Sequence, residues 1–195
     1  MPPALRIGVL AFHGDVSEHA DAMAKAAAQK KRPLEIVYVR RQADAEGLDG
    51  LIIPGGESTT LYKLCEREGM LDELRTIKCI FGTCAGAIML ARRLEGAAEN
   101  QKTLALMDIT VDRNAYGRQS DSFQTEIETK FGPIEASFIR APRIVKLGAG
   151  VDPVAHFGGE VIGCEQTSGG RYYLALTFHP ELTTPAFHEY FLTKL

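Results

Sequence analysis

Residues 79–90 have the sequence CIFGTCAGAIML, in which an apolar run passes into a helical pattern through a turn of small residues. The apolar run is typical of a buried strand, and AGAIMLARRL (85–94) has helical periodicity. Between them, residues 82–86 have the G-x-nucleophile-x-G form of a strand-to-helix elbow, whose glycines allow the backbone to turn tightly. The stretch therefore predicts a strand, a strained turn at Cys84 and a helix.

The same alternation of apolar run and helix precedes this stretch. Asp15 and Glu18 have capping-box spacing at the start of an Ala-rich helix, and Ser58 or Thr59 would cap the next helix. Such alternation predicts a parallel sheet covered by helices on both faces. We expect strands at 5–11, 34–40, 50–56 and 78–82, and helices at 15–31, 58–69 and 85–94.

After residue 100 the pattern changes to strands, and the middle ones alternate apolar and polar residues. We expect strands within 103–114, 122–130, 134–142, 153–166 and 171–180, and a closing helix at 184–195. We therefore expect an α/β fold of three layers, with a mostly parallel central sheet and an antiparallel extension. Repeats, low-complexity tracts and linkers are absent from the sequence, so residues 1–195 are expected to form a single domain.

Composition narrows the classes of function. The chain has 195 residues, 45% of them hydrophobic, and a net charge of −3 with Lys and Arg spread along its length. This distribution does not favour a nucleic-acid or anionic-membrane partner. Every apolar run is shorter than the roughly 18 residues that a membrane-spanning helix needs. The four cysteines form no C-x-x-C pair, so neither a disulfide framework nor a metal site is indicated, and a reducing, cytoplasmic location is expected.

The elbow gives Cys84 a chemical role. At a helix N-terminus, unpaired N–H groups and the helix dipole favour a thiolate, and the amide of Ala85 would face a developing oxyanion. The alternative is a buried, inert thiol, which is the common fate of a free cysteine. We expect that fate for the other three cysteines, Cys65, Cys79 and Cys164.

A nucleophilic thiol needs a base, and His179 is the preferred candidate among five histidines. Pro180 favours an extended backbone at His179, which lets Glu181 point the same way and accept the imidazole N–H. Carboxyl ends of parallel strands share one edge of the sheet, so His179 can meet Cys84 there. These residues predict a Cys-His-Glu triad.

Of the other histidines, His19 and His188 are expected on solvated helix faces, whereas His13 ends the first strand and competes as a base. PGGES (54–58) follows another strand. Its consecutive glycines allow a ligand to approach the backbone closely, so Gly56 is a candidate for a second oxyanion donor.

In chain order, PGGES, GTCAG (82–86) and HPE (179–181) resemble the class I, triad-type glutamine amidotransferases, whose sheet is flavodoxin-like. A longer resemblance includes IGVLAFHGDVSEH, DRNAYGRQSDSF (112–123) and FIRAP (138–142). It covers essentially the whole chain, and it is to the glutaminase subunits of pyridoxal 5′-phosphate (vitamin B6) synthases.

This resemblance implies an activity and its residues. Cys84 would attack the amide of L-glutamine to form a thioester, His179 would protonate the departing ammonia and activate water, and Glu181 would orient His179. Gly56 and Ala85 would form the oxyanion hole. The implied substrate-binding residues are Gly56, Glu57, Ser58, Arg113, Ile139 and Arg140.

The charges of these residues suit a free amino acid, because Arg113 can pair with its carboxylate and Glu57 can pair with its ammonium group. The family also implies that the protein partner is a synthase subunit, with ammonia passed to it along a protected route. Neither a cofactor nor a metal is expected, since the sequence has no P-loop, dinucleotide fingerprint or metal-ligand spacing. One departure is Phe12-His13-Gly14, where the family commonly has L-Q-G, so an imidazole replaces an amide.

Three alternatives stay open from the sequence. The chain could serve another biosynthetic synthase, although DRNAYGRQSDSF and FIRAP argue against that. It could be a cysteine hydrolase of the related elbow fold, in which a histidine tends to follow the cysteine where this chain has Ala85. It could also be a catalytically silent binding subunit, in which Cys84 would be unreactive.

Overall fold

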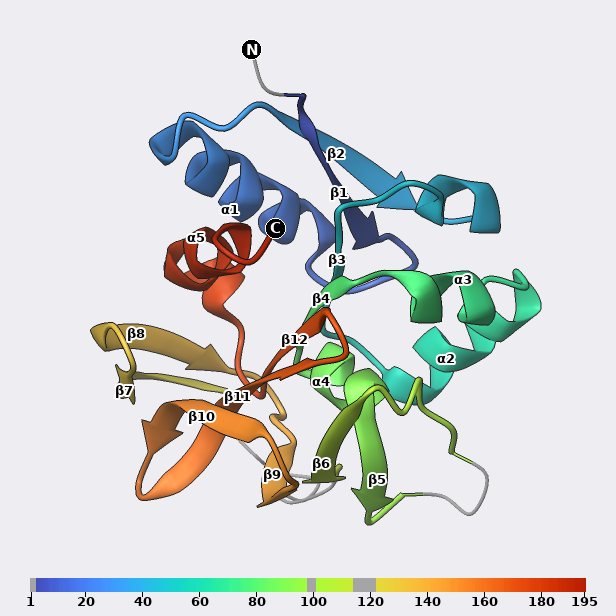
Figure 1. Cartoon of the computed structure of the whole chain (residues 1–195). Coiled ribbons are helices and arrows are strands. Elements are labelled where there is room, and N and C mark those ends of the chain that lie inside the picture. The colour runs from blue at the N-terminus through green and yellow to red at the C-terminus, as the bar shows by residue number, and fades with distance from the viewer. Residues whose placement is uncertain (1–2, 98–100, 114–121) are drawn as a thin grey trace.

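The computed structural model describes residues 3–97, 101–113 and 122–195 (Figure 1). In this part of the chain the central element is one sheet. Its strands, in spatial order, are β2 (Leu34–Val39), β1 (Leu5–Leu10), β3 (Gly50–Ile53), β4 (Cys79–Thr83), β12 (Arg171–Leu176), β11 (Glu160–Ser168), β10 (Val151–Phe157), β7 (Phe123–Thr129) and β8 (Gly132–Phe138). From β2 to β12 all neighbours are parallel, and from β12 to β8 all are antiparallel.

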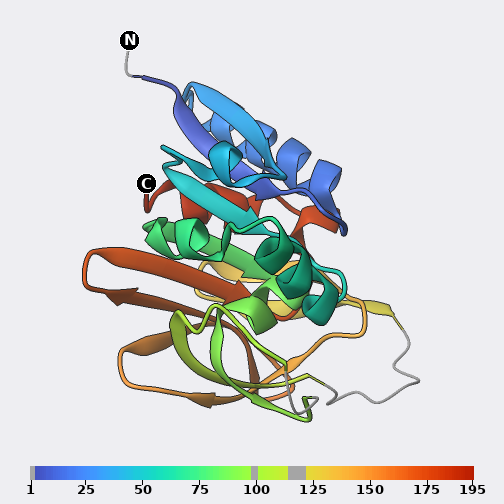
Figure 2. The ribbon, with the colours of Figure 1, turned by 90° about the vertical axis from the view of Figure 1, so that its right-hand side faces the viewer.

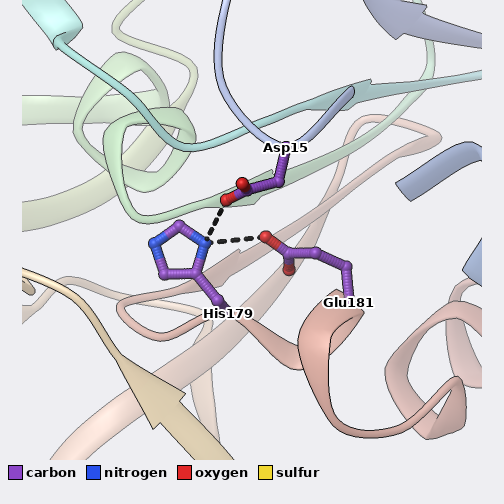
Figure 3. A group of neighbouring side chains, drawn as sticks. All are labelled: Asp15, His179 and Glu181. Atoms are coloured by element: carbon purple, nitrogen blue, oxygen red, sulfur yellow. Dashed lines mark hydrogen bonds and ion pairs between the residues drawn. The ribbon is translucent and has the colours of Figure 1, made fainter. Parts of the chain in front are cut away.

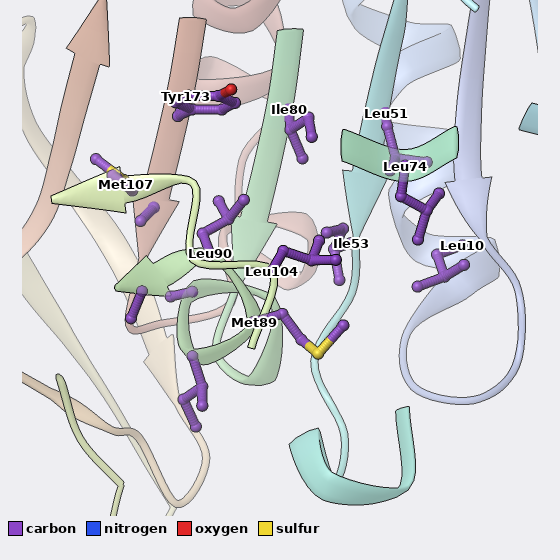
Figure 4. Packing of buried hydrophobic residues seen from close by; sticks show 14 of the residues in the cluster. Leu10, Leu51, Ile53, Leu74, Ile80, Met89, Leu90, Leu104, Met107 and Tyr173 are labelled. Atoms are coloured by element: carbon purple, nitrogen blue, oxygen red, sulfur yellow. The ribbon is translucent and has the colours of Figure 1, made fainter. Parts of the chain in front are cut away.

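Helices cover both faces of the parallel half. One face packs against α1 (Val16–Gln29) and α5 (Ala186–Leu192). The other packs against α2 (Ser58–Arg67), α3 (Leu71–Thr76) and α4 (Ala85–Leu90). Adjacent strand residues point to opposite faces, so Phe81 belongs to the first of these cores and Ile80 to the second. Figure 4 shows the second core, in which Ile80 and Leu51 lie near Leu74 of α3.

The antiparallel half carries a small second sheet made of β5 (Ala91–Glu95), β6 (Met107–Asp112) and β9 (Arg143–Leu147). Figure 2 shows it at the end of the molecule away from β1 and β2. Two 3₁₀ turns, η1 (Gln42–Ala45) and η2 (Pro180–Leu182), complete the described elements. The predicted α/β class, with a parallel sheet between helical layers and an antiparallel extension, is confirmed.

One predicted helix is too long. The 85–94 pattern forms a helix only as far as Leu90, and Ala91 turns to extended backbone, with φ −62° and ψ 138°. Residues from Ala91 onward pair in parallel with β6, and Arg92 and Arg93 are exposed beside Asp108. Strand pairing therefore overrides the helical propensity of this segment. The strand β9 was also not among the predicted elements.

Both predicted helix caps are wrong. Asp15 precedes α1 but makes no side-chain cap, because its carboxylate contacts His179 instead. Neither Ser58 nor Thr59 caps α2. The Glu57 carboxylate does so, accepting the backbone N–H groups of Thr59 at 3.0 Å and Thr60 at 2.7 Å.

Sheet order decides where the motifs meet. In the register of the sheet, Leu176 of β12 lies beside Thr83 of β4, and Ile53 of β3 lies beside Gly82. The segments that follow β1, β3, β4 and β12 therefore emerge at one edge of the sheet, as expected. None of the helices in the described residues is long and apolar enough to cross a membrane.

Candidate active site

The turn at Cys84 is strained. Cys84 has φ +50° and ψ −105°, a left-handed conformation that non-glycine residues rarely adopt. Its N–H donates to Leu176 O of β12 at 2.8 Å, which ties the turn to the neighbouring strand. The Cys84 side chain is nearly buried, and its S–H donates to Ile139 O at 3.8 Å.

The glycines beside Cys84 are required by close packing. A Cβ on Gly82 would lie 2.5 Å from the backbone of Gly86, and a Cβ on Gly86 would lie 2.0 Å from Ile53 O. Either methyl group would push α4 away from the sheet. The small residues of the elbow therefore allow the first turn of α4 to lie directly against β3 and β4.

His179 lies at the same edge, buried at 3% exposure. Its backbone N–H donates to Ser137 O at 2.8 Å, which fixes the end of β12 against β8. Its ring Nδ1 lies 2.7 Å from Glu181 Oε1 and 3.0 Å from Asp15 Oδ2, as Figure 3 shows. Both carboxylates therefore face the same imidazole N–H.

These contacts determine the charge on His179. Burial alone would lower its pKa, but hydrogen bonds with Asp15, Cys84 and Glu181 outweigh burial and raise the pKa of His179 to about 12. The imidazole is thus positively charged at neutral pH. An imidazolium that faces Cys84 is the partner that a thiolate needs.

Glu181 is the buried anion of this group. Its side chain is 0% exposed. Burial would raise its pKa, but contacts with His179 and His19 outweigh burial and hold the pKa of Glu181 well below its ordinary value. His19 Nε2 lies 3.3 Å from Glu181 Oε1. The expectation that His19 and His188 lie on solvated faces is wrong, since both are 0% exposed.

The glycine loop after β3 lies against two imidazoles. A Cβ on Gly55 would lie 2.4 Å from His179 Cε1, and one on Gly56 would lie 2.2 Å from His13 Nδ1. Gly56 also has φ +125°, which a side chain would disfavour. Ala85 is fully buried as the first residue of α4. An oxyanion hole formed by Gly56 and Ala85 remains a prediction.

His13 lies against the glycine loop, where its ring packs on Gly56, whereas the imidazole that faces Cys84 is that of His179. The Nε2 atom of His13 is buried and has no hydrogen-bond partner within the described residues. The Phe12-His13-Gly14 departure therefore places an unpaired ring nitrogen under the candidate oxyanion loop.

Three of the six predicted substrate-binding residues, Glu57, Ser58 and Arg113, belong to one polar network. The Arg113 guanidinium pairs with Glu57 and donates to Thr59 Oγ1 at 2.8 Å and to Gln101 Oε1 at 2.6 Å. Gln101 Nε2 in turn donates to Ser58 Oγ at 2.9 Å. Burial would raise the pKa of Glu57, but its bonds to Thr60 and Thr59 and the charge of Arg113 lower it to about 2.

The remaining two predicted binding residues follow β8. Ile139 is half-buried and offers its carbonyl to Cys84, whereas the Arg140 side chain is exposed and its backbone has φ +45°. Of the motif DRNAYGRQSDSF, residues 114–121 lie outside the described residues. The binding roles of Ile139 and Arg140 remain predictions.

Asp15, His179 and Glu181 each offer a ligand atom within 4.8 Å of the others, a spacing that a metal ion could use. Both carboxylate contacts, however, converge on one Nδ1 atom. A metal there would replace the proton that both carboxylates accept, so hydrogen bonding and metal binding exclude each other at this nitrogen.

Four residues of the site are not predicted by the sequence patterns: Asp15 and Gln101, and the two buried histidines His19 and His188. Asp15 was interpreted as a helix cap, and the histidines were assigned to the wrong helix face. Their contacts join segments far apart in the sequence, for example His19 and His188. The only local signal is the position of Asp15 just after a strand, at the ligand-binding edge of the sheet.

The site has a strained cysteine at a strand-to-helix turn, and this cysteine faces a buried histidine and carboxylate at the edge of an α/β sheet. These features define the class of α/β proteins with a cysteine at a nucleophile elbow. The SNO glutamine amidotransferase family model matches residues 9–195, and the chain belongs to this family. The resemblance inferred from the sequence motifs is therefore confirmed.

Curated relatives agree along nearly the whole chain. "Pyridoxal 5′-phosphate synthase subunit PdxT" of Thermococcus onnurineus is 43% identical, over 97% of this chain and 98% of that protein. The protein of the same name from Methanocaldococcus jannaschii is 46% identical, over 94% of each chain.

Solved structures give the same result for the fold. A crystal structure titled as a glutamine amidotransferase superposes with a TM-score of 0.81 at 40% identity, covering 96% of this chain and 97% of that one. A putative GMP synthase component from Thermoplasma acidophilum, at 17% identity and a TM-score of 0.61, covers 100% of this chain and 93% of its own and shares the fold alone.

Proposed function

We propose that this protein hydrolyses L-glutamine to L-glutamate and ammonia, in the role of the glutaminase subunit of a pyridoxal 5′-phosphate synthase. The observation that carries the proposal is the placement of Cys84 beside His179 and Glu181 at the carboxyl edge of the sheet, with 2.7 Å between His179 Nδ1 and Glu181 Oε1. Membership of the SNO glutamine amidotransferase family supports the same reaction.

In the proposed reaction, the Cys84 thiolate attacks the side-chain amide carbon of glutamine and forms a C–S bond. The Gly56 and Ala85 amides stabilise the negative oxygen of the tetrahedral intermediate. The C–N bond then breaks, and the His179 imidazolium gives its proton to the departing nitrogen, which leaves as ammonia. A thioester between Cys84 and the glutamyl group remains.

Hydrolysis of the thioester returns the enzyme to its first state. Neutral His179 takes a proton from water as the oxygen attacks the thioester carbon, and the C–S bond breaks to release glutamate. Glu181 accepts the Nδ1–H of His179 throughout, which keeps the Nε2 atom available for these proton transfers. Asp15, at 3.0 Å from the same Nδ1, adds to this orientation.

Glutamine would be held by the network that begins at α2. We assign Arg113 to the α-carboxylate and Glu57 to the α-ammonium, while Ser58, Gly56, Ile139 and Arg140 complete the binding site. Arg113 and Glu57 pair with each other here, so glutamine would exchange that ion pair for its own two charges.

We place the protein, as a single domain of residues 1–195, in a hetero-oligomer with the synthase subunit that consumes the ammonia. The names of the 41–46% identical relatives support such a partner. We also place it in the cytoplasm, where a reducing environment keeps a catalytic thiol free. All four cysteines are unpaired.

The test is glutamate and ammonia release from L-glutamine, measured with and without the synthase subunit of the same organism. We expect release that the partner stimulates and that Cys84→Ser lowers at least about 1,000-fold, while the stability of the chain changes by only about 1 kcal/mol. The matched control is Cys65→Ser, a buried thiol in α2, remote from the sheet edge. Undiminished turnover in Cys84→Ser would contradict the triad, and no release in either condition would favour a silent binding subunit.

A further inference from the structure

A second pair of histidines lies behind the candidate triad. His19, on α1, and His188, on α5, are both 0% exposed. His19 Nδ1 lies 2.9 Å from His188 Nε2, and His19 Nε2 lies 2.9 Å from Thr83 Oγ1 and 3.3 Å from Glu181 Oε1. One imidazole thus contacts the triad carboxylate, the residue before Cys84 and a second imidazole.

The positions of the protons follow from these contacts. Glu181 is an ionised acceptor, so a His19 Nε2 that carries a proton donates toward it and toward Thr83. His19 Nδ1 is then a bare acceptor, and His188 Nε2 must donate to it. His188 Nδ1, which has no partner within the described residues, is left as an unprotonated nitrogen.

Other proton arrangements are less favourable. If His19 carried its proton on Nδ1 alone, its bare Nε2 would face the Glu181 carboxylate, acceptor against acceptor. If both nitrogens of His19 carried protons, His188 Nε2 would be the acceptor. In either case His188 would hold its own proton on Nδ1, a buried donor that lacks a partner within the described residues, which costs more than a bare nitrogen.

His188 is suited to this role because it stays neutral. Burial lowers the pKa of His188 to about 3, so its ring carries a single proton at physiological pH. Phe81 lies against His188 and His19, with ring centroids 5.3 Å and 6.1 Å away, which keeps water from this pair.

We propose that His19 is a positioning residue of the active site, which donates its Nε2–H to Glu181, and that His188 fixes the tautomer of His19. The proton chain then runs from His188 to His19 to Glu181, and His179 donates to Glu181 from the other side. Its consequence for catalysis rests on the proposed glutaminase function.

This arrangement explains why the triad carboxylate holds one orientation. Glu181 Oε1 accepts from His179 and His19, whereas Oε2 has no partner within the described residues. Without His19, Glu181 would keep a single strong hydrogen bond and could rotate about it. His19 also contacts Thr83, so a single residue of α1 holds both the turn at Cys84 and the Glu181 carboxylate in position.

The first experiment compares two variants in the complex with the synthase subunit. His19→Gln retains an N–H near the Nε2 position, and His19→Leu removes it. We expect kcat for glutamine hydrolysis to fall roughly 10- to 100-fold in His19→Leu and to recover most of that loss in His19→Gln, with KM nearly unchanged. His156→Gln, on an exposed part of β10, is the control and should match wild type.

Equal loss in both His19 variants, or no loss in either, would overturn the positioning role. Urea unfolding of each variant separates a stability defect from a defect in kcat. A wild-type complex that releases no glutamate would contradict the proposed function itself, and the second experiment then decides the proton chain without any activity.

The second experiment is ¹⁵N NMR of the free wild-type protein with histidine labelled in the ring. We expect His19 and His188 each to be protonated on Nε2 and bare on Nδ1, and His188→Phe to change the His19 signals. The proton chain would be refuted by a His19 ring protonated on Nδ1. Spectra of His19→Gln and His188→Phe assign the two rings.

Discussion

Gly55 lies under the imidazole of His179, and this contact leads to a prediction for a single residue. A Cβ at this position would lie 2.4 Å from His179 Cε1, although the Gly55 backbone lies outside the left-handed region. Gly55→Ala should therefore fold but displace the ring. We expect glutamine hydrolysis to fall roughly 100-fold, because a shift of about 1 Å is that costly in an active site.

The control for this substitution is Gly170→Ala. Gly170 has φ +74° and open space around its Cα, so the alanine should cost about 1 kcal/mol of unfolding free energy and leave turnover unchanged. Wild-type rates in Gly55→Ala would show that His179 tolerates the displacement. Circular dichroism and urea unfolding check that both variants are folded.

Single residues differ in how well the local sequence predicts their position. The rule that parallel strands end at one edge of the sheet predicts that Cys84, His179 and Glu181 meet, and in the structure His179 faces Cys84 and lies 2.7 Å from Glu181 Oε1. Asp15 and His19 were assigned to a cap and a solvated face. A local pattern depends only on neighbours in the sequence. The partners of these two residues are distant in sequence: Asp15 contacts His179, just after β12, and His19 contacts Glu181 of η2 and His188 of α5.

At the scale of an element, the start of α2 depends on Glu57. Its carboxylate accepts two backbone N–H groups and the Thr60 hydroxyl, and it pairs with Arg113. We expect Glu57→Ala to lower the free energy of unfolding by about 1 kcal/mol, as loss of a helix N-cap does. Glu126→Ala, an exposed glutamate on β7, is the matched control.

The readout for Glu57→Ala is urea unfolding at two pH values. The pKa of Glu57 is lowered to about 2 from an ordinary 4.5, so its contribution is present above pH 4.5 and is lost as the pH falls toward 2. The difference between wild type and Glu57→Ala should therefore shrink on acidification. A difference independent of pH would mean that the charge of Glu57 does not support the helix.

Elements were predicted well where the pattern and the pairing agree. Apolar runs before glycines became β1, β3 and β4, since strands buried on both faces need such runs. Residues 91–94 (ARRL) end a predicted helix because they favour helices, yet in the structure they belong to β5 and pair with β6. Pairing between strands of a small second sheet depends on the tertiary fold, and a local pattern cannot reveal it.

For the whole molecule, the charges at the sheet edge predict how stability depends on pH. The pKa of His179 rises from 6.5 to about 12 on folding, so its stabilisation is complete below pH 6.5 and is lost as the pH rises toward 12. The pKa of Glu181 is lowered, so its stabilisation is present above pH 4.5 and is lost in acid. Both contributions are complete only between these two pH values.

We therefore expect the unfolding free energy of wild type to decline as the pH rises from about 6.5 to about 9, and that of His179→Gln to decline less. Urea unfolding across this range measures both slopes, with His156→Gln as the control that should follow wild type. Parallel curves for wild type and His179→Gln would show that His179 is not charged in the folded protein.

The order of strands in the large sheet also has a consequence for synthesis. β12 lies between β4 and β11, although 87 residues separate the end of β4 at Thr83 from the start of β12 at Arg171. During synthesis on the ribosome, Cys84 emerges long before His179, and the position of β12 between β4 and β11 is still empty. In the proposed mechanism, a nascent chain therefore carries its thiol without a base, and amide cleavage begins only after β12 has joined the sheet.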